Sequence, residues 1–148
     1  MWIGQPTSNK LSVNSDRGND TTMKQQEIIN KIIEASEAIG WFVTTSKLED
    51  DAVEVNFNTD TKYGQDLNCW ATLIDTDIES LANEIQRWYE CYDPDEETLL
   101  WVGVNGHGVN GAPYRLRDIL NDMEDAESRL GDLAIALQTL AGEIIKQL

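Results

Sequence analysis

The chain has 148 residues, which fits a single domain, and its 27 acidic against 11 basic side chains give a net charge of −16. Such a surface repels nucleic acid and anionic membranes, which excludes both as direct targets and indicates a basic protein partner. A hydrophobic fraction of 41%, with five tryptophans, supports a folded core rather than a disordered acidic tail.

Residues 1–22 are polar and predict a flexible leader, followed by a single domain over residues 23–148. A helix is expected over residues 23–39, where isoleucines recur at helical spacing. Thr22 and Gln25 match a capping box at its start, and Gly40 is a natural stop.

Residues 41–75 predict a three-stranded antiparallel meander. Trp41–Thr45 is the first strand, and the alternation of apolar and polar residues over Val53–Phe57 is typical of a half-buried second strand. The third strand, Leu67–Ile74, is more apolar, and we therefore expect it to be the central one.

A second helix is expected over residues 77–92, where Thr76 and Glu79 match a capping box. The apolar run Leu99–Val104 predicts a fourth strand. The competing interpretation is a short helix from Asp95, because three consecutive acids suit the first turn of a helix.

One long helix is expected over residues 114–148, after a glycine-rich loop and with Pro113 at its first position. Its apolar residues are separated by alternating steps of four and three, which predicts a heptad seam. The seam either packs on the chain's own sheet and first helix or pairs with a second copy in a homodimer. Its members are Ile119, Met123, Ala126, Leu130, Leu133, Leu137, Leu140 and Ile144. The predicted fold class is α+β, with an antiparallel sheet of three or four strands.

Acidic residues are concentrated between Leu48 and Glu97, where 15 acids accompany two bases. Asp118, Asp122 and Asp125 form a further acidic stripe along one face of the C-terminal helix. Neighbouring carboxylates in such a stripe are about 5–6 Å apart, which is comparable to the spacing of phosphates along one nucleic-acid strand. The alternative interpretation of these acidic residues is a solvent-exposed surface that keeps the protein soluble. The expected partner-binding residues are Glu49, Asp50, Asp51, Glu54, Asp93, Asp95, Glu96, Glu97, Asp118, Asp122 and Asp125.

The loop from Gly106 to Gly111 matches the dinucleotide-binding pattern G-x-G-x-x-G. We reject that function because no second strand follows to complete a βαβ unit. Anion capture at the following helix is a minor alternative, and a tight turn is the plain interpretation. The loop residues singled out as candidates are His107, Asn110 and Tyr114.

No metal site or cofactor is expected. Cys69 and Cys91 have neither a zinc spacing nor a disulfide framework, which favours a reduced, cytosolic setting. The start of the chain lacks the apolar core of a signal peptide, and no apolar run approaches the roughly 18 residues of a membrane helix.

Six short segments carry a resemblance to known proteins: Phe57–Asp60, Gly64–Asp66, Asp93–Glu97, Gly106–Gly108, Asn110–Tyr114 and Asp122–Glu124. The pattern resembles small acidic accessory proteins of phages, plasmids and conjugative elements of gut bacteria. The stretch that carries it, from Phe57 to Met123, covers a little under half of the chain. The resemblance implies the cytoplasm of a bacterial host cell and a role in protecting mobile DNA, as anti-restriction and anti-CRISPR proteins do.

The first hypothesis is therefore a non-enzymatic inhibitor. Its acidic, DNA-mimicking surface would block the basic nucleic-acid channel of a CRISPR effector or a restriction enzyme. The alternative is an acidic scaffold domain that dimerises or binds a partner helix through the heptad seam. A third, weaker hypothesis is an enzyme whose site includes His107, Asp66 and Tyr114.

Overall fold

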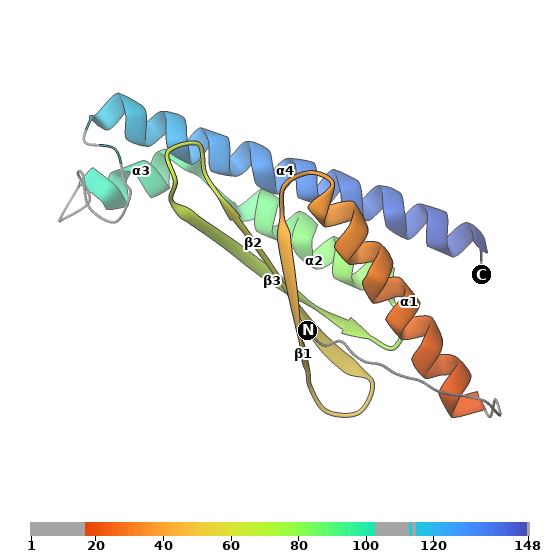
Figure 1. The fold of residues 1–148 in the computed structure, drawn as a ribbon. Coiled ribbons are helices and arrows are strands. Elements are labelled where there is room, and N and C mark those ends of the chain that lie inside the picture. Colours follow the sequence, from red (N-terminus) through yellow and green to blue (C-terminus); the bar gives the residue numbers. More distant parts are fainter. Residues whose placement is uncertain (1–16, 103–112, 114, 148) are drawn as a thin grey trace.

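A computed structural model describes residues 17–102, 113 and 115–147, and within them the chain is α+β (Figure 1). The elements follow one another as a helix, a three-stranded sheet and three further helices. They are α1 (Arg17–Glu37), β1 (Phe42–Lys47), β2 (Ala52–Asp60), β3 (Asp66–Ile74), α2 (Ile78–Cys91), α3 (Pro94–Val102) and α4 (Leu116–Gln147).

The sheet is an antiparallel meander in the order β1-β2-β3, as predicted, but its central strand is β2. The prediction that the third strand is central was wrong. Short turns join each strand to the next, so the middle strand of the meander pairs on both sides. The apolar character of β3 arises instead because Trp70 and Ile74, on its outward face, are also apolar and exposed.

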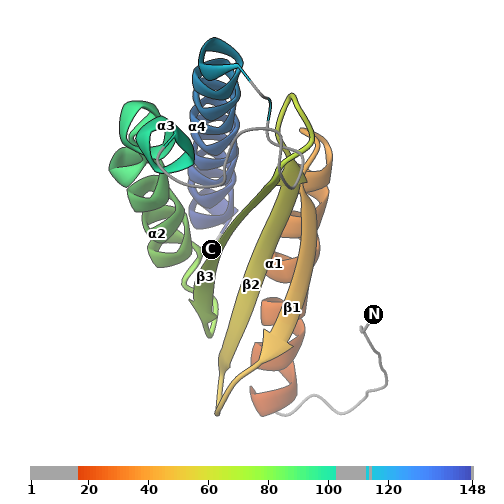
Figure 2. The same cartoon turned by 90° about the vertical axis from the view of Figure 1, so that its left-hand side faces the viewer.

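The described helices cover one face of the sheet. Along each strand, buried and solvent-accessible residues alternate, and all the helices lie on the buried side (Figure 2). The inward residues are Val43, Val53, Val55, Phe57, Leu67, Cys69, Ala71 and Leu73. The opposite face carries asparagines, threonines, Trp70 and Phe42, and no described helix covers it.

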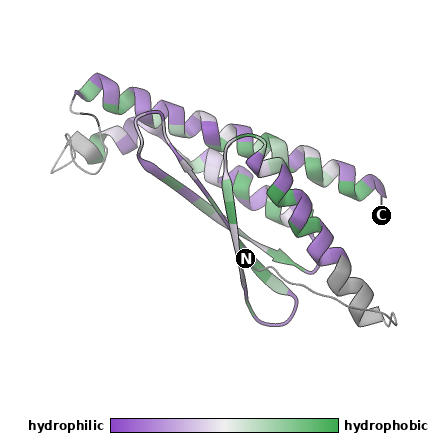
Figure 3. Ribbon diagram, viewed as in Figure 1, coloured by the Kyte–Doolittle hydropathy of each residue, from purple (hydrophilic) through white to green (hydrophobic). Residues whose placement is uncertain are grey.

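The long helix α4 packs within its own chain. It lies against α2, α3 and α1, and hydrophobic and hydrophilic residues alternate along it (Figure 3). Every member of the predicted heptad seam, Ile119, Met123, Ala126, Leu130, Leu133, Leu137, Leu140 and Ile144, is buried in the single chain. The homodimer interpretation of the seam is therefore wrong, since these residues already belong to the core.

Three helix starts differ from the prediction. Helix α1 begins at Arg17, so residues 17–22 of the expected leader are helical and Thr22 lies inside the helix instead of capping it. The rest of the expected leader lies outside the described residues. The N-cap of α2 is Asp77, whose carboxylate accepts the Ser80 N–H at 3.1 Å. Helix α4 begins at Leu116, beyond Pro113.

The expected fourth strand is also wrong, because its described residues are part of helix α3. The Asp93 side chain accepts the Asp95 N–H at 3.0 Å. The acids of the first turn interact favourably with the positive end of the helix dipole. This N-terminal signal outweighed the apolar run that follows it.

Among the described residues, no helix is both long and apolar enough to cross a membrane.

The packing of α4 predicts a large stability effect without a change of oligomeric state. Leu137→Ala removes a fully buried side chain and should lower the free energy of unfolding by about 2–5 kcal/mol. Ile135→Ala, on the exposed side of the same helix, should cost less than about 0.5 kcal/mol. Urea unfolding and sedimentation velocity measure the two quantities. If Leu137→Ala left the stability unchanged but abolished a dimer, the result would support the interpretation that the seam pairs two copies of the chain.

Candidate functional site

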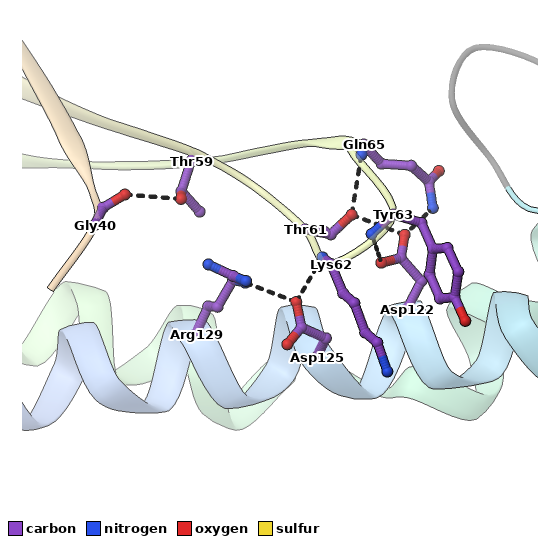
Figure 4. A network of polar contacts seen from close by, with 9 residues as sticks. All are labelled: Gly40, Thr59, Thr61, Lys62, Tyr63, Gln65, Asp122, Asp125 and Arg129. Atoms are coloured by element: carbon purple, nitrogen blue, oxygen red, sulfur yellow. Dashed lines mark hydrogen bonds and ion pairs between the residues drawn. The ribbon is translucent and has the colours of Figure 1, made fainter.

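Asp122 and Asp125 of the predicted acidic stripe of α4 face the chain's own β2–β3 turn (Figure 4). Asp122 is fully buried, and its carboxylate accepts three hydrogen bonds from that turn. They come from the Thr61 hydroxyl at 2.8 Å, the Tyr63 N–H at 2.9 Å and the Gln65 side-chain amide. The polar donors offset the cost of removing the carboxylate from water.

The two other members of the stripe point at the same turn. One Asp125 oxygen accepts the Lys62 N–H at 2.7 Å and the Arg129 Nε–H at 2.6 Å, and Asp118 accepts the Tyr63 hydroxyl at 3.4 Å. The spacing was therefore right that the three share a face, but that face is turned toward the β2–β3 turn, with Asp122 buried and Asp118 and Asp125 half-buried. Asp122 cannot touch a partner, and its assignment to the binding surface was wrong.

Replacing Asp122 should be far more costly than replacing Asp125. Asp122→Ala leaves two buried donors, the Thr61 hydroxyl and the Gln65 amide, without an acceptor, at about 1–3 kcal/mol each, so we expect a loss of at least about 2 kcal/mol. Asp125→Ala, at a half-exposed position of the same helix, should cost about 1 kcal/mol or less. Urea titrations of both variants measure the difference. Equal losses would show that the Asp122 network does not hold the turn.

The first predicted acidic group lies in the β1–β2 turn, where Glu49, Asp50 and Asp51 are exposed. This turn is joined to the β3–α2 turn, because the Asp51 carbonyl accepts the Asp75 N–H at 2.9 Å. The Gln25 side-chain amide of α1 also donates to the Asp51 carbonyl at 2.5 Å and to the Asp75 carbonyl at 3.0 Å. The junction gathers the acids of both turns, including Asp77 at the N-terminus of α2, at one end of the domain.

Glu54, assigned to this group by sequence, lies apart from the turn. It is half-buried in β2 and faces Thr72 of β3, whose N–H is accepted by Glu84 of α2 at 3.4 Å. Glu54 and Glu84 therefore lie on either side of Thr72, between the two ends of the domain.

The second predicted group, Asp93, Asp95, Glu96 and Glu97, occupies the α2–α3 junction. Helix α2 has 14 residues, so about 20 Å separates this junction from the turns at the other end. Partial burial and the neighbouring carboxylates of Glu96 and Asp93 raise the pKa of Glu97, which means that its negative charge is poorly compensated.

An open groove of about 520 Å³ links the second acidic group to the edge of the sheet. Its walls are Trp70, Glu84, Arg87, Trp88, Cys91, Tyr92 and Glu97. The Trp70 and Trp88 rings meet edge to face with centroids 4.6 Å apart, and the Trp88 indole N–H donates to the Trp70 carbonyl at 2.8 Å. We call these seven residues the aromatic groove.

The aromatic groove was not predicted from the sequence. Trp88 and Tyr92 follow the apolar residues of α2 at helical spacing, which favours the core face, and both are in fact half-buried at the margin of the core. The missed signal was the strand alternation of β3, in which Cys69 and Ala71 point inward and Trp70 must therefore point outward. Trp70 is distinguished from a single exposed aromatic residue by its contact with Trp88, and paired exposed aromatic side chains are enriched at protein interfaces.

The predicted loop candidates His107, Asn110 and Tyr114 lie outside the described residues, as does the glycine-rich pattern around them. Asp66, the other residue of the enzyme hypothesis, is exposed at the start of β3, where it pairs with Asp60 across the hairpin.

The two cysteines differ sharply in their surroundings. Burial raises the pKa of the Cys69 thiol to about 12, whereas Cys91 is exposed in the aromatic groove. At pH 8 iodoacetamide should therefore modify Cys91 alone in the folded protein, and both residues in urea, as read by mass spectrometry of peptides. Equal modification of Cys69 under native conditions would contradict the buried position of β3.

Compared with known proteins, the chain matches no family model, no curated protein and no solved structure.

Proposed function

We propose that this protein is a non-enzymatic inhibitor that binds the basic nucleic-acid channel of a host defence nuclease, either a CRISPR effector or a restriction enzyme. Its exposed carboxylates would occupy the positions of nucleic-acid phosphates. The observation that carries the proposal is that few of the negative charges are paired with a basic side chain. Among the described residues, Arg129–Asp125 is the one ion pair.

The arrangement of the acids supports the proposal. Acids lie at both ends of α2, about 20 Å apart, with Glu84 between them. One strand of B-DNA carries about six phosphates over that length, at one per about 3.4 Å. The carboxylates are sparser than phosphates, yet they follow a path that a basic channel can accommodate.

The difference between acids that have partners inside the fold and acids that do not also supports the proposal. Asp122 and Asp125 have partners inside the fold, and Asp77 and Asp93 cap helices. Glu49, Asp50, Asp95 and Glu96 are exposed and have no side-chain hydrogen bond among the described residues. Since such charges repel one another, they cost stability in the free protein and are explained by a basic partner.

The competing scaffold function loses its main support. It required the seam of α4 to be free for a partner helix, and the seam is buried in the chain's own core.

Charge reversal tests the proposal. The immobilised protein should capture a nuclease from lysates of bacteria that express CRISPR effectors and restriction enzymes. The nuclease should be released between 50 and 500 mM salt, because attraction between exposed charges is screened, and also by its own DNA or RNA. Lysine at Glu49, Asp50 and Asp51, or at Asp95, Glu96 and Glu97, should abolish capture and inhibition of cleavage.

The matched control reverses three exposed acids of α4 instead: Glu124, Asp132 and Glu143. It changes the net charge equally and should retain most of the inhibition. Circular dichroism checks that every variant remains folded. If the control and test variants lost the same amount of inhibition, the effect would be due to net charge and not to the position of the acids. A captured partner that is not released at high salt would contradict mimicry of nucleic acid.

A further inference from the structure

The aromatic groove combines rigid rings with uncompensated negative charge. The edge-to-face contact and the indole hydrogen bond fix Trp70 and Trp88 relative to each other. The Tyr92 hydroxyl contacts the Met123 sulfur of α4 at 3.3 Å, which holds the third ring. Because these side chains are already ordered, a ligand would lose little entropy by binding against them.

The groove exposes more aromatic surface than the fold requires. Trp70 retains 49% of its accessible surface, although it lies beside the half-buried Trp88. Tryptophans placed in this way are typical centres of protein interfaces. The face of an indole ring also attracts cations, at about 0.5–2 kcal/mol depending on solvent access.

Two carboxylates in the groove favour a ligand with a positive charge. Glu84 lies on the β3 side and Glu97 on the α3 side, and the single base, Arg87, is exposed. Arg87 forms no ion pair with either glutamate within the described residues. A cation that enters the groove would offset the repulsion that Glu97 experiences from Glu96 and Asp93.

We propose that the aromatic groove binds an arginine side chain of the protein partner, with the guanidinium against the indole rings and its charge facing Glu84 and Glu97. Arginine fits better than lysine because its planar group stacks on aromatic rings and donates several hydrogen bonds to carboxylates. The identity of the partner rests on the proposed function, whereas the preference for arginine rests on the groove alone.

The test is a titration of the full chain, ¹⁵N-labelled, with the peptide acetyl-Gly-Arg-Gly-amide. The indole N–H signals of Trp70 and Trp88, assigned through Trp70→Thr and Trp88→Phe, should shift in a saturable way. A citrulline peptide, which keeps the shape but lacks the charge, should bind at least tenfold more weakly, and a lysine peptide at least threefold more weakly. Equal shifts with arginine and citrulline would overturn the proposal.

Single substitutions locate the charge that matters. Glu97→Gln should weaken arginine binding at least threefold, and Arg87→Gln should strengthen it about twofold by removing a competing cation. Glu143→Gln removes one exposed negative charge of α4, about 30 Å along the helix from Met123, which contacts Tyr92 of the groove, and should leave affinity unchanged. If Glu97→Gln and Glu143→Gln have the same effect, or if neither indole signal responds, the groove is not an arginine site.

The result is separable from the proposed function. Arginine binding without capture of any nuclease supports the groove and contradicts the inhibitor proposal. Capture that is abolished by the charge reversals but unaffected by Trp70→Thr supports the inhibitor and contradicts a role for the groove.

Discussion

The fold depends on one buried carboxylate. Asp122 of α4 accepts three hydrogen bonds from the β2–β3 turn, and it connects the last helix to the far tip of the sheet. Apolar packing of α4 against α1, α2 and α3 is not directional, so it would tolerate sliding of the helix along its axis. The hydrogen bonds to Asp122 fix the position of the helix, because only one register places its carboxylate among those donors.

Fixing α4 has consequences at the functional surface. Helix α4 supports α2 and α3, whose junction presents one acidic group and one wall of the aromatic groove. Tyr92 illustrates the connection, since its ring lines the groove while its hydroxyl contacts Met123 of α4. This strongly acidic chain thus uses a few of its carboxylates for hydrogen bonds inside the fold and keeps most of the described ones at the surface.

The sequence was sufficient for the three strands and for the presence of the long helix, because alternation and heptad spacing are local patterns. It was not sufficient for the order of the strands, which depends on their pairing. It could not tell whether the heptad face meets the same chain or a second copy, since apolar residues are identical in both cases. It also misassigned Asp122: an aspartate on a helix is indistinguishable from a solvated one until Thr61 and Gln65, about 60 positions earlier, are seen beside it. The groove was missed for a related reason, because Trp70 and Trp88 meet only after α2 has packed on β3.

The separation in sequence between Asp122 and its partners also bears on how the chain folds. The β2–β3 hairpin is local and can form within microseconds. Its tip, however, lacks its buried acceptor until α4 has been synthesised and has docked, a contact that closes a loop of 61 residues at Thr61. Such non-local contacts slow folding, so the hairpin tip and the N-terminal part of α4 should acquire protection from hydrogen exchange together and late.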